Sequence, residues 1–119
     1  MRLQSGRQFR AVYDRGLSSA RGPLAIYARP NGLGHARLGL SVPRRVGSAV
    51  VRNRVKRLLR ESFRLHQHAL PAGYDVVINV RPHRPLTLAE YGFLLTRALE
   101  TLHQRWIRQA AKPLHGPGA

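Results

Sequence analysis

The chain has 119 residues, enough for one domain with a modest hydrophobic core. Lysine and arginine total 21 against five acidic residues, a formal net charge of +16 that favours nucleic acid as a partner over an anionic membrane surface. No cysteine is present, which excludes disulfides and thiolate zinc sites. The N-terminus lacks an apolar signal region and no apolar run reaches membrane-spanning length, so we expect a cytoplasmic protein.

A short helix is predicted near the N-terminus. Ser5 and Gln8 have the spacing of a capping box that opens a helix, and Gly16 is placed to end it. One face of this helix carries Phe9, Val12 and Tyr13, which are spaced at i, i+3 and i+4. We expect Val12 to anchor the helix and Tyr13, with its polar tip, to be partly exposed. For Phe9, burial and exposure are equally compatible with the pattern.

Extended segments follow this helix. Residues 18–23 form a connection that could hold a short edge strand. Residues 24–29 and 37–42 alternate apolar and polar side chains on either side of a Pro-Asn-Gly turn, which predicts a β-hairpin. In this hairpin Tyr27 and Arg29 would share the face turned away from the core.

The most informative segment is predicted to form a long helix from about Ser48 to Ala69. Its core-facing side would carry Val51, Val55, Leu58, Leu59, Ser62 and His66, with Leu65 and Ala69 close by. Its opposite side would carry Asn53, Lys56, Arg57, Arg60 and Arg64. Like charges at i, i+4 repel each other, and Glu61 is the only acid among them, so the stripe favours a phosphate partner. A solvated face and a membrane-surface helix are the alternatives.

The C-terminal third contains a strand and a helix. Residues 74–80 are dense in apolar side chains, which predicts a buried strand. Thr87 and Glu90 form a second capping-box pattern. The helix that follows has a core face made of Tyr91, Leu94, Leu95, Ala98, Leu102 and Trp106. Residues 110–119 have linker composition and are expected to form a disordered tail after a single α+β domain over 1–109.

The ionisable residues do not suggest catalysis by the chain itself. The acids are Asp14, Glu61, Asp75, Glu90 and Glu100, spread over different predicted elements with no pair at metal-ligand spacing. His66 and His68 lie two apart on a helix and point about 200° apart, so they cannot chelate one ion. A nucleic-acid surface is better supported, because Arg37, Ser41, Asn79 and Arg81 occupy the same alternate positions on their strands as Tyr27.

The segment from Arg37 to Arg64, RLGLSVPRRVGSAVVRNRVKRLLRESFR, resembles the signature of the bacterial ribonuclease P protein subunit. The resemblance rests on Arg52-Asn53-Arg54, followed in register by Lys56, Arg57, Arg60 and Phe63 and preceded by Gly47 and Arg44-Arg45. It extends from about Leu3 to about Gln109. Pro43, where a hydroxyl residue is common, and the arginine pair in place of lysines depart from the pattern without removing charge.

The resemblance implies a fold. It is the α+β, α-β-β-β-α-β-α two-layer sandwich of the ribosomal protein S5 domain 2-like type. The first strand is short, and the parallel βαβ crossover through the basic helix is left-handed, against the usual right-handed rule. Neither feature follows from the periodicity alone.

The resemblance also implies a function: the protein subunit of a ribonucleoprotein endoribonuclease that removes the 5′ leader of precursor tRNA. In that family the catalytic RNA does the chemistry with Mg²⁺, so no metal is expected on the protein, and one monomeric protein binds one RNA. Positions matching the leader-binding cleft are Phe9, Tyr13, Tyr27, Lys56 and Arg60. Positions matching the surface for the RNA subunit are Arg44, Arg45, Arg52, Asn53, Arg54 and Arg57.

Two rival functions remain at this stage. A ribosomal or other structural RNA-binding protein would have the same composition, but would have no reason to distinguish precursor from mature tRNA. A DNA-binding domain could place the 52–64 helix in a major groove, although no helix-turn-helix or zipper context is visible.

Overall fold

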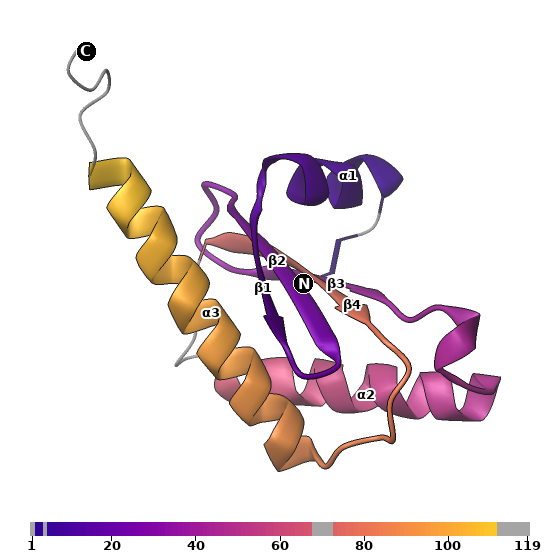
Figure 1. The fold of residues 1–119 in the computed structure, drawn as a ribbon. Helices are drawn as coiled ribbons and strands as arrows, with labels where there is room; N and C mark the ends of the chain where they lie inside the picture. Colours follow the sequence, from indigo (N-terminus) through magenta and orange to yellow (C-terminus); the bar gives the residue numbers. More distant parts are fainter. Residues whose placement is uncertain (1, 4, 68–72, 112–119) are drawn as a thin grey trace.

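The computed structural model describes residues 2–3, 5–67 and 73–111. Its elements are α1 (Gly6–Arg15), β1 (Leu17–Arg21), β2 (Leu24–Pro30), β3 (Arg37–Ser41), the 3₁₀ turn η1 (Arg44–Val46), α2 (Ala49–His66), β4 (Tyr74–Val80) and α3 (Leu88–Ala111). This order confirms the predicted α-β-β-β-α-β-α succession in a mixed sheet (Figure 1). None of the described helices is long and apolar enough to cross a membrane.

The predicted hairpin between 24–29 and 37–42 is wrong. The sheet order is β1-β2-β4-β3, so β4 lies between the two segments, antiparallel to β2 and parallel to β3. The hairpin partner of β2 is instead β1. The physical reason lies in β4, which is buried at six of its seven positions and therefore needs a neighbour on both sides as well as cover on both faces.

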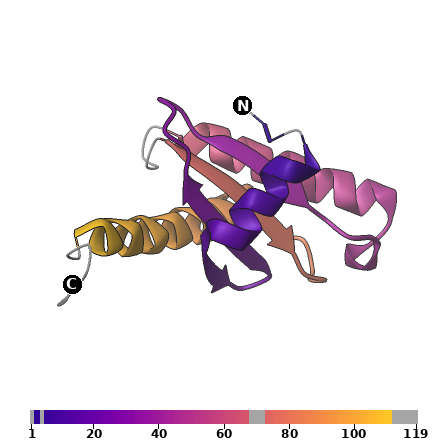
Figure 2. The ribbon, with the colours of Figure 1, turned by 90° about the horizontal axis from the view of Figure 1, so that it is seen from above.

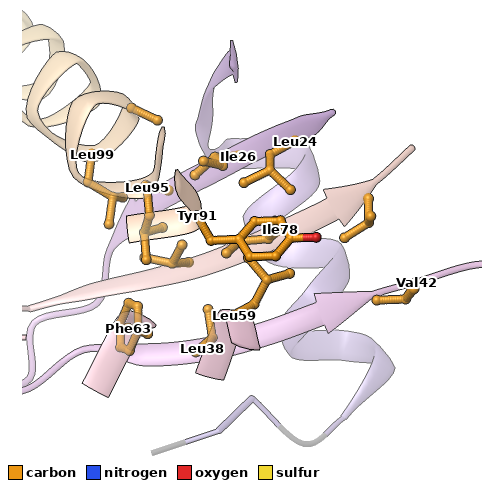
Figure 3. Close-up of a cluster of buried hydrophobic side chains, with 14 of the residues drawn as sticks. Leu24, Ile26, Leu38, Val42, Leu59, Phe63, Ile78, Tyr91, Leu95 and Leu99 are labelled. Atoms are coloured by element: carbon orange, nitrogen blue, oxygen red, sulfur yellow. The ribbon is translucent and has the colours of Figure 1, made fainter. Parts of the chain in front are cut away.

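The main core lies between one face of the sheet and the helices α2 and α3. Figure 3 shows Leu59 and Phe63 of α2 and Tyr91 and Leu95 of α3 in one cluster with Ile78 of β4. The helical wheel correctly placed Val55, Leu59 and Ser62 in the core, but it missed Phe63, which is buried, and wrongly added Leu65, which is 50% exposed. The buried face of α2 therefore includes Phe63 and excludes Leu65.

The first helix covers the opposite face of the sheet, and its predicted caps are confirmed. The Gln8 N–H donates to the Ser5 hydroxyl, the Gln8 side chain accepts from the Ser5 N–H, and the Gly16 N–H closes the helix. Val12 is fully buried and packs with Leu3 against Val77 of β4. Figure 1 shows α1 on one side of the strands and α2 on the other, and Figure 2 shows α1 crossing the sheet.

The last helix begins with the predicted capping box. The Thr87 N–H donates to the Glu90 carboxylate and the Glu90 N–H to the Thr87 hydroxyl. The helix continues to Ala111, two residues beyond the expected end of the domain at 109. Residues 112–119, where the disordered tail was predicted, and residues 68–69 at the predicted end of the basic helix lie outside the described residues.

Candidate nucleic-acid interface

An aromatic group forms on the sheet face that α1 crosses. Phe9 and Tyr13 extend from α1, and Tyr27 stands on β2 between the buried Ile26 and Ala28. All three are half-buried and pack beside the Leu3–Val12–Val77 cluster. The partial exposure predicted for Tyr13 and Tyr27 is confirmed. Half-buried rings on a sheet are suited to stacking on bases, because each ring is held by its buried part.

Phe9 rests directly on the backbone of β3. A Cβ atom built on Gly39 would lie 2.5 Å from the Cζ atom of the Phe9 ring, so only glycine allows this contact without displacing the ring. The close approach of the Phe9 ring therefore explains why glycine stands at position 39, in the middle of β3. This glycine lets α1 approach β3 and fixes the position of the first aromatic ring.

Tyr13 is oriented by a side chain 66 residues further along the chain. Its hydroxyl donates to Oδ1 of Asn79 on β4 over 2.6 Å, and its ring meets the Tyr27 ring edge-on at 5.0 Å and 84°. Burial raises the pKa of Tyr13, and the hydrogen bonds with Asn79 and Ser41 oppose that rise only in part. Tyr13 therefore stays a neutral phenol near pH 7 and presents no negative charge to RNA.

A partly buried ion pair lies at one end of the same face. Nε and Nη2 of Arg37 each reach a carboxylate oxygen of Asp75 at 2.8 Å, and Nδ2 of Asn31 donates to Oδ1 of Asp75 at 2.9 Å. Arg37 was predicted to line the nucleic-acid surface. The structure places it on that face but neutralises its charge with Asp75, which sequence reasoning had not paired with any residue.

We expect replacement of Asp75 by asparagine to lower the free energy of unfolding by about 2 kcal/mol near pH 7, because the bidentate pair to Arg37 is lost in a largely buried setting. Burial alone would raise the pKa of Asp75, but hydrogen bonds from Arg37 and Asn31 and the charges of Arg37 and Arg29 bring it below its ordinary value. The carboxylate thus stabilises the fold above its unfolded pKa, and this contribution is lost as the pH falls through the folded pKa.

Urea unfolding of both proteins between pH 7 and pH 2 measures this effect. The difference between wild type and Asp75→Asn should narrow at the acid end. The matched control is Glu61→Gln, which breaks an exposed ion pair with Arg64 and should change stability little. A difference that is constant over this pH range would show that the Asp75 carboxylate is not the stabilising group.

The basic helix α2 presents half of its lysine and arginine side chains fully to solvent. Asn53, Arg54 and Arg57 are exposed, and within the described part of the chain no acceptor or acid pairs with them. Arg52 differs, because its Nε donates to the carbonyl oxygen of Gly47 at 3.2 Å and so closes the turn that leads into the helix. The positive charge of Arg52 remains available to a phosphate, while the hydrogen bond to Gly47 fixes the position of its side chain.

The turn before α2 and the end of α2 complete this cationic surface. Arg44 and Arg45 are exposed on η1, directly before the helix. Arg64 is not a free cation, because it forms an i, i+3 ion pair with Glu61 at 2.7 Å. The stripe available for phosphate therefore runs from η1 to about Arg60.

Lys56 and Arg60 are half-buried on α2, and α2 covers the sheet face opposite to the aromatic group. Among the described residues no hydrogen bond or ring contact joins them to Phe9, Tyr13 or Tyr27. The five positions matched to a leader-binding cleft thus form two groups, three aromatic side chains on one face and two cations beside the other.

The two groups approach each other at the outer edge of β3. Arg2 forms a single parallel bridge with Leu38, and the Leu3 N–H donates to the Leu38 carbonyl oxygen at 3.0 Å. Leu3 packs with Val12 beside the aromatic group, while burial and the nearby charge of Arg2 lower the pKa of Arg60. Arg2 and Leu3 therefore extend the sheet between the aromatic and the cationic group.

The described residues contain no group of three or more histidine, cysteine, aspartate or glutamate side chains that could hold a metal ion. Asp75, the one buried acid among them, is engaged by Arg37 and Asn31. Aromatic rings on an open sheet face and a long arginine stripe without compensating acids define a small, basic α+β protein that binds RNA.

Comparison with known proteins identifies the family. Residues 1–110 match the family model "Ribonuclease P". The chain is 42% identical over 82 residues to the ribonuclease P protein component of Alkaliphilus metalliredigens, covering 69% of this chain and 74% of that protein. It is 48% identical over 80 residues to that of Caldanaerobacter subterraneus, covering 67% and 69%. The chain therefore belongs to the ribonuclease P protein family.

Solved structures agree with this assignment. The RNase P protein of Staphylococcus aureus has a TM-score of 0.74 at 30% identity, with 84% of this chain and 93% of that chain covered. The protein from Thermotoga maritima has a TM-score of 0.67 at 30% identity, with 88% and 96% covered. The fold class and the role as a protein component of ribonuclease P, both expected from the Arg37–Arg64 segment, are confirmed.

Proposed function

We propose that this chain holds the 5′ leader of precursor tRNA against its aromatic group while its arginine stripe binds the catalytic RNA of ribonuclease P. The observation that carries the proposal is the set of Phe9, Tyr13 and Tyr27, three half-buried rings gathered where α1 crosses the sheet. Three rings in this position can stack successive bases of a single strand, and they do so without requiring base pairing.

The cations complete the two surfaces. Lys56 and Arg60 would contact leader phosphates at the β3 edge. The surface for the RNA subunit would consist of Arg44, Arg45, Arg52, Asn53, Arg54 and Arg57, which lie together on η1 and the first half of α2. Arginine suits this role because its planar fork contacts phosphate oxygens in pairs.

The cleavage step belongs, in this proposal, to the RNA subunit. The described residues hold no carboxylate cluster that fits Mg²⁺, so we assign the metal to the RNA and its substrate rather than to the protein. The protein would act by binding and orienting the precursor, as one copy per RNA. The holoenzyme would then remove the leader endonucleolytically and leave the mature 5′ end.

The test is precursor tRNA cleavage by a bacterial ribonuclease P RNA at low Mg²⁺, with and without this protein. We expect strong stimulation that is greater for a leader of several nucleotides than for a leader of one. Equal stimulation for both leaders would contradict the leader-binding role. Tight binding to any RNA without stimulation would instead indicate a structural RNA-binding protein.

A further inference from the structure

We propose that Asn79 reads one base of the bound leader, as a hydrogen-bond donor that favours keto bases (uracil and guanine) over amino bases (adenine and cytosine). The inference rests on the proposed function, because it assumes that a single strand stacks on the aromatic group. It adds base selectivity and assigns it to a polar residue on the floor of that surface.

The first observation is the fixed orientation of the Asn79 amide. Its Oδ1 accepts the short 2.6 Å hydrogen bond from the Tyr13 hydroxyl. This leaves the amide nitrogen as the unused end of the side chain. Within the described part of the chain, Nδ2 of Asn79 donates to no acceptor. It is also not buried, so a ligand can reach it.

The second observation is the space around the amide. Asn79 pairs in register with Ala25 of β2 on one side and Ser41 of β3 on the other, and both side chains are small. Asn79 is half-buried, so its tip is open to solvent on the face that α1 crosses. The strand neighbours therefore leave room beside the amide, and the large side chain that contacts it is Tyr13, which binds at Oδ1 and not at Nδ2.

The third observation is the distance to a stacking ring. Tyr27 pairs directly with Val77, which makes Asn79 its diagonal neighbour on the next strand, roughly 7 Å away. This separation matches the width of a nucleobase. A base that stacks on Tyr27 and extends toward β4 would place its edge at Nδ2 of Asn79.

The chemistry of the amide then sets the preference. An asparagine whose amide oxygen and amide nitrogen are both unoccupied pairs with adenine, because it offers a donor and an acceptor side by side. Here Tyr13 occupies the acceptor, so Asn79 offers mainly its two N–H groups. At the 4/6 position of the base edge, O4 of uracil and O6 of guanine accept from these donors, whereas the exocyclic amines of cytosine and adenine at the same position are donors themselves. One such hydrogen bond corresponds to roughly a three- to tenfold difference in affinity.

The experiment measures dissociation constants of the holoenzyme for precursor tRNAs in which each leader position in turn is A, C, G or U. For the wild type we expect a three- to tenfold keto preference at one leader position. In Asn79→Ala this preference should fall below twofold, with less change for the amino bases. Tyr13→Phe, which keeps the ring but releases the amide, should also reduce the preference.

The matched control is Gln104→Ala, which removes an exposed amide side chain on α3 and should leave the profile unchanged. Circular dichroism establishes that each variant is folded. Equal weakening for all four bases in Asn79→Ala, or an unchanged profile, would overturn the inference and leave Asn79 as a support for Tyr13. The proposed function fails separately, if the wild type does not distinguish precursor from mature tRNA.

Discussion

Replacing Phe9 and Tyr27 together by alanine should weaken binding of precursor tRNA to the holoenzyme by about 2–6 kcal/mol, which is 1–3 kcal/mol for each lost stack. Affinity for mature tRNA should stay the same, because mature tRNA has no leader to place on these rings. The fold should persist, since Val12 and Leu3, which hold α1 and the N-terminal segment on the sheet, are retained. Equilibrium binding of the two tRNAs gives both values.

Phe93→Ala is the matched control for this variant. Phe93 lies on α3, is 63% exposed and is contacted by Arg97, so it is an accessible ring outside the aromatic group. Its removal should leave precursor binding unchanged. Equal losses of affinity for precursor and mature tRNA in the Phe9–Tyr27 variant would show that the leader does not bind to this face.

Replacing Arg54 and Arg57 together by alanine should reduce affinity for the ribonuclease P RNA by an order of magnitude or more. The dependence of log affinity on log salt should become shallower by about 1.5, because each phosphate contact contributes about 0.7–0.9 to that slope. These two arginines are chosen because they are exposed on α2 and no described acid neutralises them. Arg52 is a less clean test, since its Nε also holds the turn at Gly47.

The control for charge is the pair Arg97→Ala with Arg108→Ala on α3. It removes the same two charges from the chain but from a different helix. If net charge alone governed binding, both double variants would lose affinity and salt dependence equally. That outcome would contradict a specific interface on α2. A loss confined to the Arg54–Arg57 variant would support one.

The arrangement of acids explains why the two surfaces should be separable. Asp75 neutralises Arg37 at one end of the aromatic face, and Glu61 neutralises Arg64 toward the end of α2. From η1 through the first two-thirds of α2, seven cations therefore have no acidic partner among the described residues.

Much of the local structure could be predicted from the sequence because it rests on local interactions. The capping boxes at Ser5 and Thr87 each join residues three positions apart, and both form as expected. The strand at 74–80 has its predicted bounds, since a run of apolar side chains this short is most readily buried as a strand. The Arg52-Asn53-Arg54 motif indicated the family together with its flanking residues, which are contiguous in the Arg37–Arg64 segment.

The candidate site could be predicted only in part. The helical spacing of Phe9, Val12 and Tyr13 showed that they share a face, and the strand alternation placed Tyr27 on an exposed side. Nothing local indicated that Gly39 would support Phe9 or that Asp75 would neutralise Arg37. These contacts join residues 30 and 38 positions apart, and their partners depend on how the strands are ordered.

By itself, the sequence determined the cationic character of the protein, its helices and their caps, and the family to which it belongs, because these depend on composition, local spacing and a contiguous motif. The tertiary structure alone decided the strand order. Placing β4 between β2 and β3 broke the expected hairpin and set Asn79 beneath Tyr13. Such pairings bring together segments that are distant in sequence, so no local pattern specifies them. The stable strand order is the one that gives β4 a neighbouring strand on both sides.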